Sequence, residues 1–184
     1  GAMKPGEAQE TEMLGDHGFY LKGPFFYEPA VRVPLIVSWP RVIPAGVRST
    51  ALVELVDLAP TLLEAADLPR YAGMQGRSLW PLLTGRVPAD RHRESVYCEH
   101  YGTTYPEPGS HSAYATMLRD ERHKLVVLHG LNTGELYDLE LDPNETQYLW
   151  DSEPHQRLKT EMLMQMSDRM AWTVDPLPLR ESAF

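Results

Sequence analysis

The chain has 184 residues, of which 42% are hydrophobic, and it includes four Trp and nine Tyr. This is enough apolar material for one substantial domain or two small ones, so we expect a globular fold. The formal net charge of -9 argues against a nucleic acid or a membrane surface as partner, because both attract clustered Lys and Arg.

The first residues carry no signal of targeting or membrane insertion. No apolar run approaches the roughly 20 residues of a membrane span, and an apolar signal-peptide core is missing from the start of the chain. We therefore expect a soluble chain, with the cytoplasm favoured as its location. Gly1-Ala2-Met3 resembles the remainder of a cleaved tag, and the polar stretch that follows lacks periodicity, so residues 1–12 are expected to form a flexible lead-in.

A short apolar run covers residues 31–39. It is rich in β-branched side chains and is interrupted or followed by proline at Pro34 and Pro40. Such a run is typical of a buried strand in a sheet that is covered on both faces. The sequence therefore predicts a strand here.

The next segment has helical character. Leucine and alanine recur at helical spacing over residues 54–68, and Asp57 stands where it can cap the helix,. Residues 69–90 are punctuated by Pro, Gly and Arg and predict a loop with one helical turn near residues 78–83,. We place the boundary between two structural units, residues 13–90 and 91–184, at the end of this loop.

The second unit is predicted to form a small antiparallel sheet and a helix. Four strand-length segments lie at close spacing and are separated by turn residues, at 95–101, 113–119, 123–129 and 135–138. This arrangement favours antiparallel hairpins. The closing segment, residues 153–170, has an apolar residue at every fourth position and predicts an amphipathic helix,.

Chemically versatile side chains gather near the start of the chain. Asp16, His17 and Lys22 lie among glycines just before the predicted strand, and Arg32 lies at its beginning. Lys22 and Arg32 are suited to an anionic oxygen, and His17 to a metal or a proton transfer. A purely structural interpretation stays open, because Asp-His-Gly also occurs in turns and Glu28 is placed to pair with Arg32 four residues on.

Several motifs along the whole chain resemble one family. They are MLGDHG (13–18), KGPFFYE (22–28), VRVPLIV (31–37), LVDLAPTLL (55–63), QGRSLWPLL (75–83) and ELYDLELDPNE (135–145). Together they resemble the C-terminal part of the sulfatases, arylsulfatase-like members of the alkaline phosphatase superfamily. The resemblance implies an α/β fold: a remnant of the large sulfatase sheet in residues 13–90, then a small antiparallel sheet packed by a terminal helix in residues 91–184.

The resemblance also implies a chemistry. In that family a cysteine in a Cys-x-Pro/Ala-x-Arg motif becomes the formylglycine nucleophile, and calcium or another divalent metal neutralises the ester oxygens. Cys98, the single cysteine, lacks an Arg four positions on, so we interpret it as a semi-buried strand residue. Gln9 and Glu10 stand where the family places metal ligands. We therefore expect no metal site and no cofactor in this chain.

Two candidate site residues follow from the resemblance. Lys22 matches the family lysine that contacts the sulfate group and the leaving oxygen, and His17 lies beside it, so we predict both as vestigial catalytic and substrate-binding residues. The favoured hypothesis is a sulfatase fragment that is inactive alone. The alternative is a non-catalytic binding or self-assembly module, with a second copy or a missing N-terminal half as partner. Turnover at an altered site with Asp16 is a third hypothesis, but no motif positions a nucleophile for it.

Overall fold

The structure is a computed structural model that describes residues 15–18, 25–101 and 114–173. Its helices are η1 (Asp16–Gly18), α1 (Glu28–Val31), η2 (Leu55–Asp57), α2 (Leu58–Ala65), α3 (Trp80–Leu83), η3 (Glu153–His155) and α4 (Gln156–Trp172). Its strands are β1 (Val96–Tyr101), β2 (Tyr114–Arg119), β3 (His123–Leu128) and β4 (Thr133–Asp138). The predicted lead-in, residues 1–12, lies outside the described residues.

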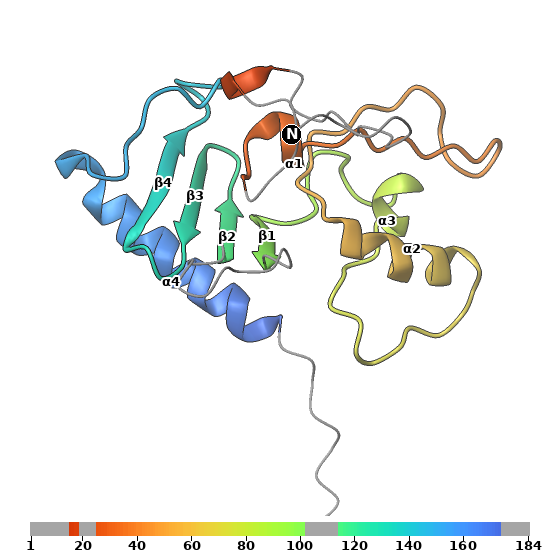
Figure 1. Ribbon diagram of the computed structural model, residues 1–184. Helices are drawn as coiled ribbons and strands as arrows, with labels where there is room; N and C mark the ends of the chain where they lie inside the picture. Colours follow the sequence, from red (N-terminus) through yellow and green to blue (C-terminus); the bar gives the residue numbers. More distant parts are fainter. Residues whose placement is uncertain (1–14, 19–24, 102–113, 174–184) are drawn as a thin grey trace, which may run out of the picture.

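The four strands form one sheet in the order β1-β2-β3-β4, with every neighbouring pair antiparallel (Figure 1). The β2–β3 turn is tight because the Asp120 carboxylate accepts hydrogen bonds from the backbone N–H groups of Arg122, at 2.8 Å, and His123, at 2.6 Å. A short polar side chain that bonds to the backbone two or three residues on is a common turn signal. The predicted hairpins are therefore confirmed.

One face of the sheet packs against α4, which crosses the strands behind the sheet in Figure 1. Met162 and Met166, one helical turn apart, lie buried against strand residues that include Leu118, Leu125 and Leu136. Residues four apart share one face of a helix, so the methionine spacing directs this side of α4 to the sheet. The α/β fold class and the packing of the terminal helix on the antiparallel sheet are confirmed.

The opposite face of the sheet carries a second apolar cluster. Ala115, Met117 and Val126 are buried together with Phe26, and Val31 of α1 packs against them. The segment that precedes α1 is therefore attached to the antiparallel sheet, although at least 89 residues separate Phe26 from these strands in the sequence. This attachment places the predicted site segment next to the second structural unit.

Residues 55–65 form η2 and α2, close to the helix predicted over residues 54–68, and α3 supplies the predicted turn at residues 80–83. Asp57 makes no capping bond to α2 itself, but it caps the start of the predicted segment, because Asp57 and Glu54 form a reciprocal capping box at η2. Asp57 is fully buried, and it accepts hydrogen bonds from the backbone N–H groups of Glu54, at 2.9 Å, and Arg77, at 2.7 Å. The Arg93 guanidinium pairs with Oδ1 of Asp57, the oxygen that also accepts the hydrogen bond from Arg77.

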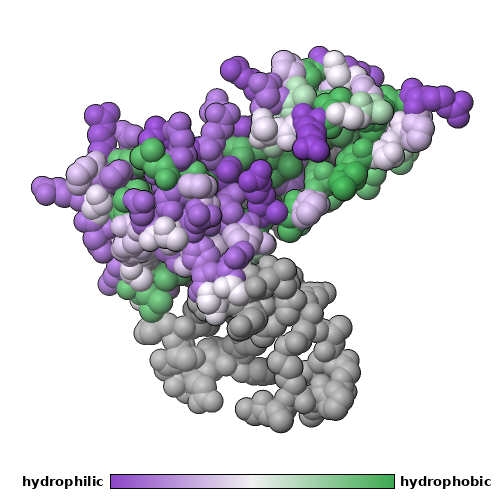
Figure 2. Space-filling view, turned by 90° about the horizontal axis from the view of Figure 1, so that it is seen from above, coloured by the Kyte–Doolittle hydropathy of each residue, from purple (hydrophilic) through white to green (hydrophobic). Residues whose placement is uncertain are grey.

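The predicted buried strand over residues 31–39 is wrong: Val31 ends α1, and residues 32–39 form neither a helix nor a strand. Ile36 is 89% exposed and Val33 is 52% exposed. A strand needs a hydrogen-bonded neighbour, and none of the four described strands pairs with this segment. Figure 2 shows exposed hydrophobic residues on the side of the molecule that carries this segment and α2.

Within the described ranges, no helix combines the length and the apolar character needed to cross a lipid bilayer.

Candidate functional site

His17 lies in a sharply bent turn, and Lys22 lies outside the described residues. The turn is closed by a hydrogen bond from Gly18 N–H to the Gly15 carbonyl oxygen at 3.0 Å. Both glycines have positive φ, 101° and 78°, and His17 itself has φ 49°. Left-handed backbone favours glycine on both sides of His17. The glycine-flanked motif therefore presents the His17 side chain at an exposed bend.

The His17 imidazole stacks on the ring of Tyr27, with ring centroids 3.8 Å apart and an angle of 9° between the planes. The ring centroid of Tyr27 in turn lies 6.4 Å from the ring centroid of Tyr137 on β4. Burial raises the pKa of Tyr27, and the charge of Glu135 raises it further. The sequence motifs did not indicate Tyr27 as a site residue, although an aromatic residue before a short helix can signal a packing contact.

A cleft of about 480 Å³ lies beside His17. One wall consists of Asp16, His17 and Arg32, and the other of the turn at residues 143–146. This turn follows β4, so the cleft combines residues near the start of the chain with residues more than 100 positions later. The sequence predicted the first wall but not the second.

A buried ionic cluster lies next to this cleft. The Lys124 ammonium, fully buried, contacts the carboxylates of Glu28, at 2.7 Å, and Glu145, at 2.6 Å. Glu28 also pairs with Arg119 at 3.0 Å, and not with Arg32 as the four-residue spacing suggested. Burial raises the pKa of Glu28, but the hydrogen bond and charge of Lys124 outweigh this effect and hold the pKa below its ordinary value.

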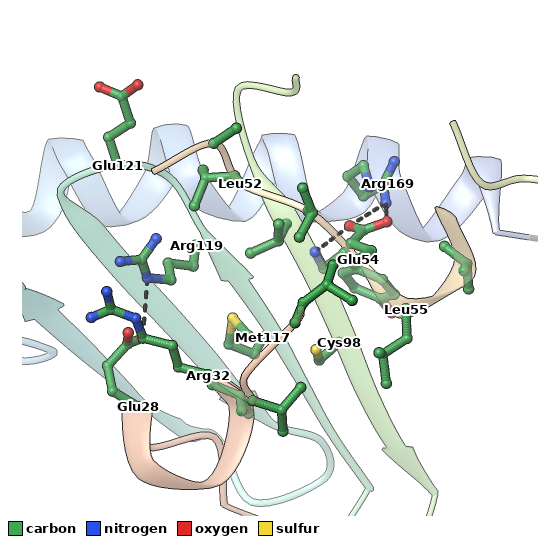
Figure 3. A pocket seen from close by; sticks show the side chains of 18 of the residues that line it. Glu28, Arg32, Leu52, Glu54, Leu55, Cys98, Met117, Arg119, Glu121 and Arg169 are labelled. Atoms are coloured by element: carbon green, nitrogen blue, oxygen red, sulfur yellow. Dashed lines mark hydrogen bonds and ion pairs between the residues drawn. The ribbon is translucent and has the colours of Figure 1, made fainter. Parts of the chain in front are cut away.

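A larger hollow, about 1400 Å³, lies between residues 49–56 and the strands β1 and β2. Figure 3 shows Cys98 and Met117 side by side on its sheet wall. Burial raises the pKa of the Cys98 thiol, and the charge of Glu54 adds to this effect. Since the thiolate is the reactive form, Cys98 is a poor nucleophile, and its partly buried position on β1 agrees with the predicted strand role.

Glu54 lines this hollow and connects the residues in front of α2 to β1 and α4. Its carboxylate pairs with Arg93, at 2.7 Å, and with Arg169 of α4, at 2.8 Å, and it accepts a hydrogen bond from the backbone N–H of Tyr97 at 2.7 Å. The last contact reaches β1 directly. The residues in front of α2 are thus tied to both the sheet and its covering helix (Figure 3).

In the described part of the chain, no group of three or more His, Cys, Asp or Glu side chains is arranged to hold a metal ion. Gln9 and Glu10, the residues at the position of the expected ligands, lie outside the described ranges. Arg32 and His17 line the cleft; a guanidinium can bind an anion there, and an imidazole can transfer a proton.

Comparison with known proteins shows to which family this chain belongs. The profile of the family described as N-sulphoglucosamine sulphohydrolase, C-terminal, matches residues 15–171. An N-acetylglucosamine-6-O-sulfatase of Bacteroides thetaiotaomicron is 33% identical over 159 residues, which cover 84% of this chain and 27% of that protein. The chain therefore belongs to the sulfatase family and corresponds to the C-terminal part of its members.

Solved structures agree with this assignment. The structure of BT4656 in complex with its substrate D-glucosamine-2-N,6-O-disulfate matches with a TM-score of 0.76 and 26% identity, over 92% of this chain and 34% of that one. A phosphonate monoester hydrolase of Agrobacterium radiobacter matches with a TM-score of 0.56 and 27% identity, over 65% of this chain and 25% of that one. The chain thus spans between a quarter and about a third of the length of these relatives.

Proposed function

We propose that this chain is the C-terminal part of a sulfuric ester hydrolase and that it does not hydrolyse esters by itself. The observation that carries the proposal is Cys98. It is the single cysteine, no Arg follows four positions later, and burial raises the pKa of its thiol. A formylglycine nucleophile, as the family resemblance implies, therefore has no source in these residues.

In this proposal, Lys22 and His17 contact the substrate. A lysine ammonium is suited to a sulfate oxygen and to the oxygen that leaves, and an imidazole transfers a proton near neutral pH. The relatives that act on N-acetylglucosamine-6-O-sulfate and D-glucosamine-2-N,6-O-disulfate support a sulfated amino sugar as the substrate class. Membership of the alkaline phosphatase superfamily, with a divalent metal in complete members, belongs to the same proposal.

The test is an assay of the purified chain with an aryl sulfate and with glucosamine-6-sulfate, with calcium, magnesium or manganese added in turn. We expect no turnover above that of the buffer. Metal-dependent turnover that disappears in Lys22→Ala would overturn the proposal, because a complete active site would then lie within this chain. Lys159→Ala is the matched control, since this lysine lies on α4, away from His17.

We propose self-association as a second role. It is supported by the exposed apolar residues of the irregular segment, Val33, Leu35, Ile36, Val37 and Trp39. An apolar, extended segment without a strand partner invites pairing with another chain. Light scattering over a range of concentrations tests this role: we expect a dimer that Ile36→Lys converts to a monomer. A monomer at every concentration would exclude it and would favour a separate N-terminal half as the partner.

A further inference from the structure

We propose that Lys124 of β3 is a positioning residue for His17, because it fixes Tyr27, the residue on whose ring the imidazole is stacked. The functional meaning of this inference rests on the proposed function, in which His17 contacts the substrate. The contacts that carry it are independent of that function. They lead in two steps from the core of the antiparallel sheet to the cleft.

The first step is the set of three contacts that the Lys124 ammonium makes. It donates a hydrogen bond to the carbonyl oxygen of Phe26 at 2.8 Å and one to the Glu145 carboxylate at 2.6 Å, and it pairs with Glu28 at 2.7 Å. Phe26 and Glu28 are the two neighbours of Tyr27 in the chain. A single buried cation therefore holds the chain on both sides of Tyr27.

Glu145 closes the cluster from the other wall of the cleft. One of its oxygens accepts the hydrogen bond from Lys124, and the other accepts one from the backbone N–H of Glu28 at 2.7 Å. Glu145 has φ 54°, a left-handed conformation that costs free energy for a residue with a side chain,. The cluster therefore fixes the turn at residues 143–146 and the start of α1 relative to each other.

The second step leads from Tyr27 to His17. The stack at 3.8 Å is the ring contact of His17 within the described residues, and Tyr27 is backed by Tyr137 of β4. The imidazole thus lies on a ring whose backbone is held by Lys124 and which lies near Tyr137 of the antiparallel sheet. Among the described residues, the stack on Tyr27 is the ring contact that orients the His17 imidazole on its glycine-flanked turn,.

A buried lysine with two carboxylates is a costly way to stabilise a fold. Desolvation of the charges offsets much of their attraction, and apolar residues of similar size often stabilise as well. What the cluster supplies is a unique geometry, since each of its hydrogen bonds fixes a direction as well as a distance. This is the property that a residue facing a substrate requires from its support.

The test is an NMR comparison of the chain with Lys124→Met, using Lys159→Met as the matched control. Lys159 donates to the Trp150 carbonyl oxygen at 2.8 Å and lies 4.6 Å from the centroid of the Trp150 ring, so its removal leaves the Tyr27 region unchanged. Amide signals of β2 and α4 report whether the sheet remains folded. The signals of the His17 ring report the stack, through the ring current of Tyr27 and through cross-relaxation between the two rings.

We expect Lys124→Met to abolish the cross-relaxation between His17 and Tyr27 and to move the His17 ring signals to values of an unstructured histidine, with β2 and α4 intact. An unchanged stack in the folded variant would overturn the proposal. If Lys124→Met does not fold, Glu28→Gln decides, because it keeps the side-chain shape and weakens the cluster: a reduced ring-current shift supports the proposal and an unchanged shift overturns it. No sulfate is used, so a failure of the proposed hydrolase function would leave this result unaffected.

Discussion

Lys124, Asp57 and Glu145 carry charges that the fold removes almost completely from solvent. A buried charge is tolerated only when oppositely charged groups and hydrogen bonds surround it. Lys124 has two carboxylates and a carbonyl oxygen as partners. A substitution is therefore expected to destabilise the fold most where it leaves one of these partners unpaired.

Asp57 gives the first prediction. Asp57→Ala leaves the backbone N–H groups of Glu54 and Arg77 without their acceptor and removes one of the two carboxylates that pair with the buried Arg93. We expect a loss of about 3–5 kcal/mol in the free energy of unfolding. Urea unfolding followed by tryptophan fluorescence measures it. Glu64→Ala, an exposed change on the same helix, is the control and is expected to stay within about 0.5 kcal/mol. Equal effects of both changes would contradict the buried role of Asp57.

Glu28 gives a prediction about pH. Its pKa in the folded chain lies below the ordinary value of 4.5, so the folded state binds the proton less tightly than the unfolded state. The stability contributed by Glu28 is then present above pH 4.5 and is lost as the pH falls through the lower folded value. Urea unfolding between pH 7 and pH 3 is expected to show a smaller acid loss in Glu28→Gln than in the unchanged chain. Glu121→Gln, an exposed change, should leave the acid loss as it is; if both variants lose the same stability, Glu28 is not coupled in this way.

The elements differ in how they are held. The strands form a continuous ladder with local turns, and α4 covers them through a few large side chains. These elements were predicted from the sequence within three residues at each end, because hairpins and amphipathic helices depend on neighbours that are close in the chain. Residues 33–39 could not be predicted in this way, since a strand also needs a partner, and the apolar pattern does not say whether one is present.

The packing of α4 on the sheet can be tested by substitution of Met166. Its side chain is 2% exposed and packs in the sheet-facing core, and the Thr116 hydroxyl donates to its sulfur at 3.1 Å. Met166→Ala is expected to cost about 2–5 kcal/mol, because a large buried side chain is replaced by a cavity. Met164→Ala, which removes the same group from a side chain that is 67% exposed, should have little effect. Thermal unfolding of the two variants decides between these positions.

The whole molecule combines a sheet covered by α4 with the region of α2 and α3 beside β1 (Figure 1). Glu54 contacts both parts, through Arg169 of α4 and the backbone of Tyr97 on β1. The Gln75 side chain also donates a hydrogen bond to the Thr173 carbonyl oxygen just after α4, at 2.7 Å, and the hollow that Cys98 lines lies between residues 49–56 and the sheet. Coupling between them therefore depends strongly on a few polar contacts.

Arg169 tests this coupling. Arg169→Met removes the cation that α4 offers to Glu54, and we expect amide hydrogen exchange in residues 54–65 to become several-fold faster, while exchange in β2 and β3 stays unchanged. Arg157→Met is the matched control, because Arg157 lies on the same helix and pairs with Glu161 in an exposed position. Exchange that accelerates equally throughout the chain would indicate a global loss of stability and would contradict a local connection.

The sequence by itself determined the sulfatase family, the four strands, the closing helix and His17 as a residue at a bend, because these depend on local spacing, turn chemistry and motif order. Lys22 and the division of the chain at residue 90 remain predictions. The tertiary structure alone decided that Glu28 pairs with Lys124 and that Asp57 is a buried partner of Arg93. The physical reason is distance along the chain: residues 28 and 124 meet only when the sheet has formed, and no local pattern encodes which distant charge a buried side chain will find.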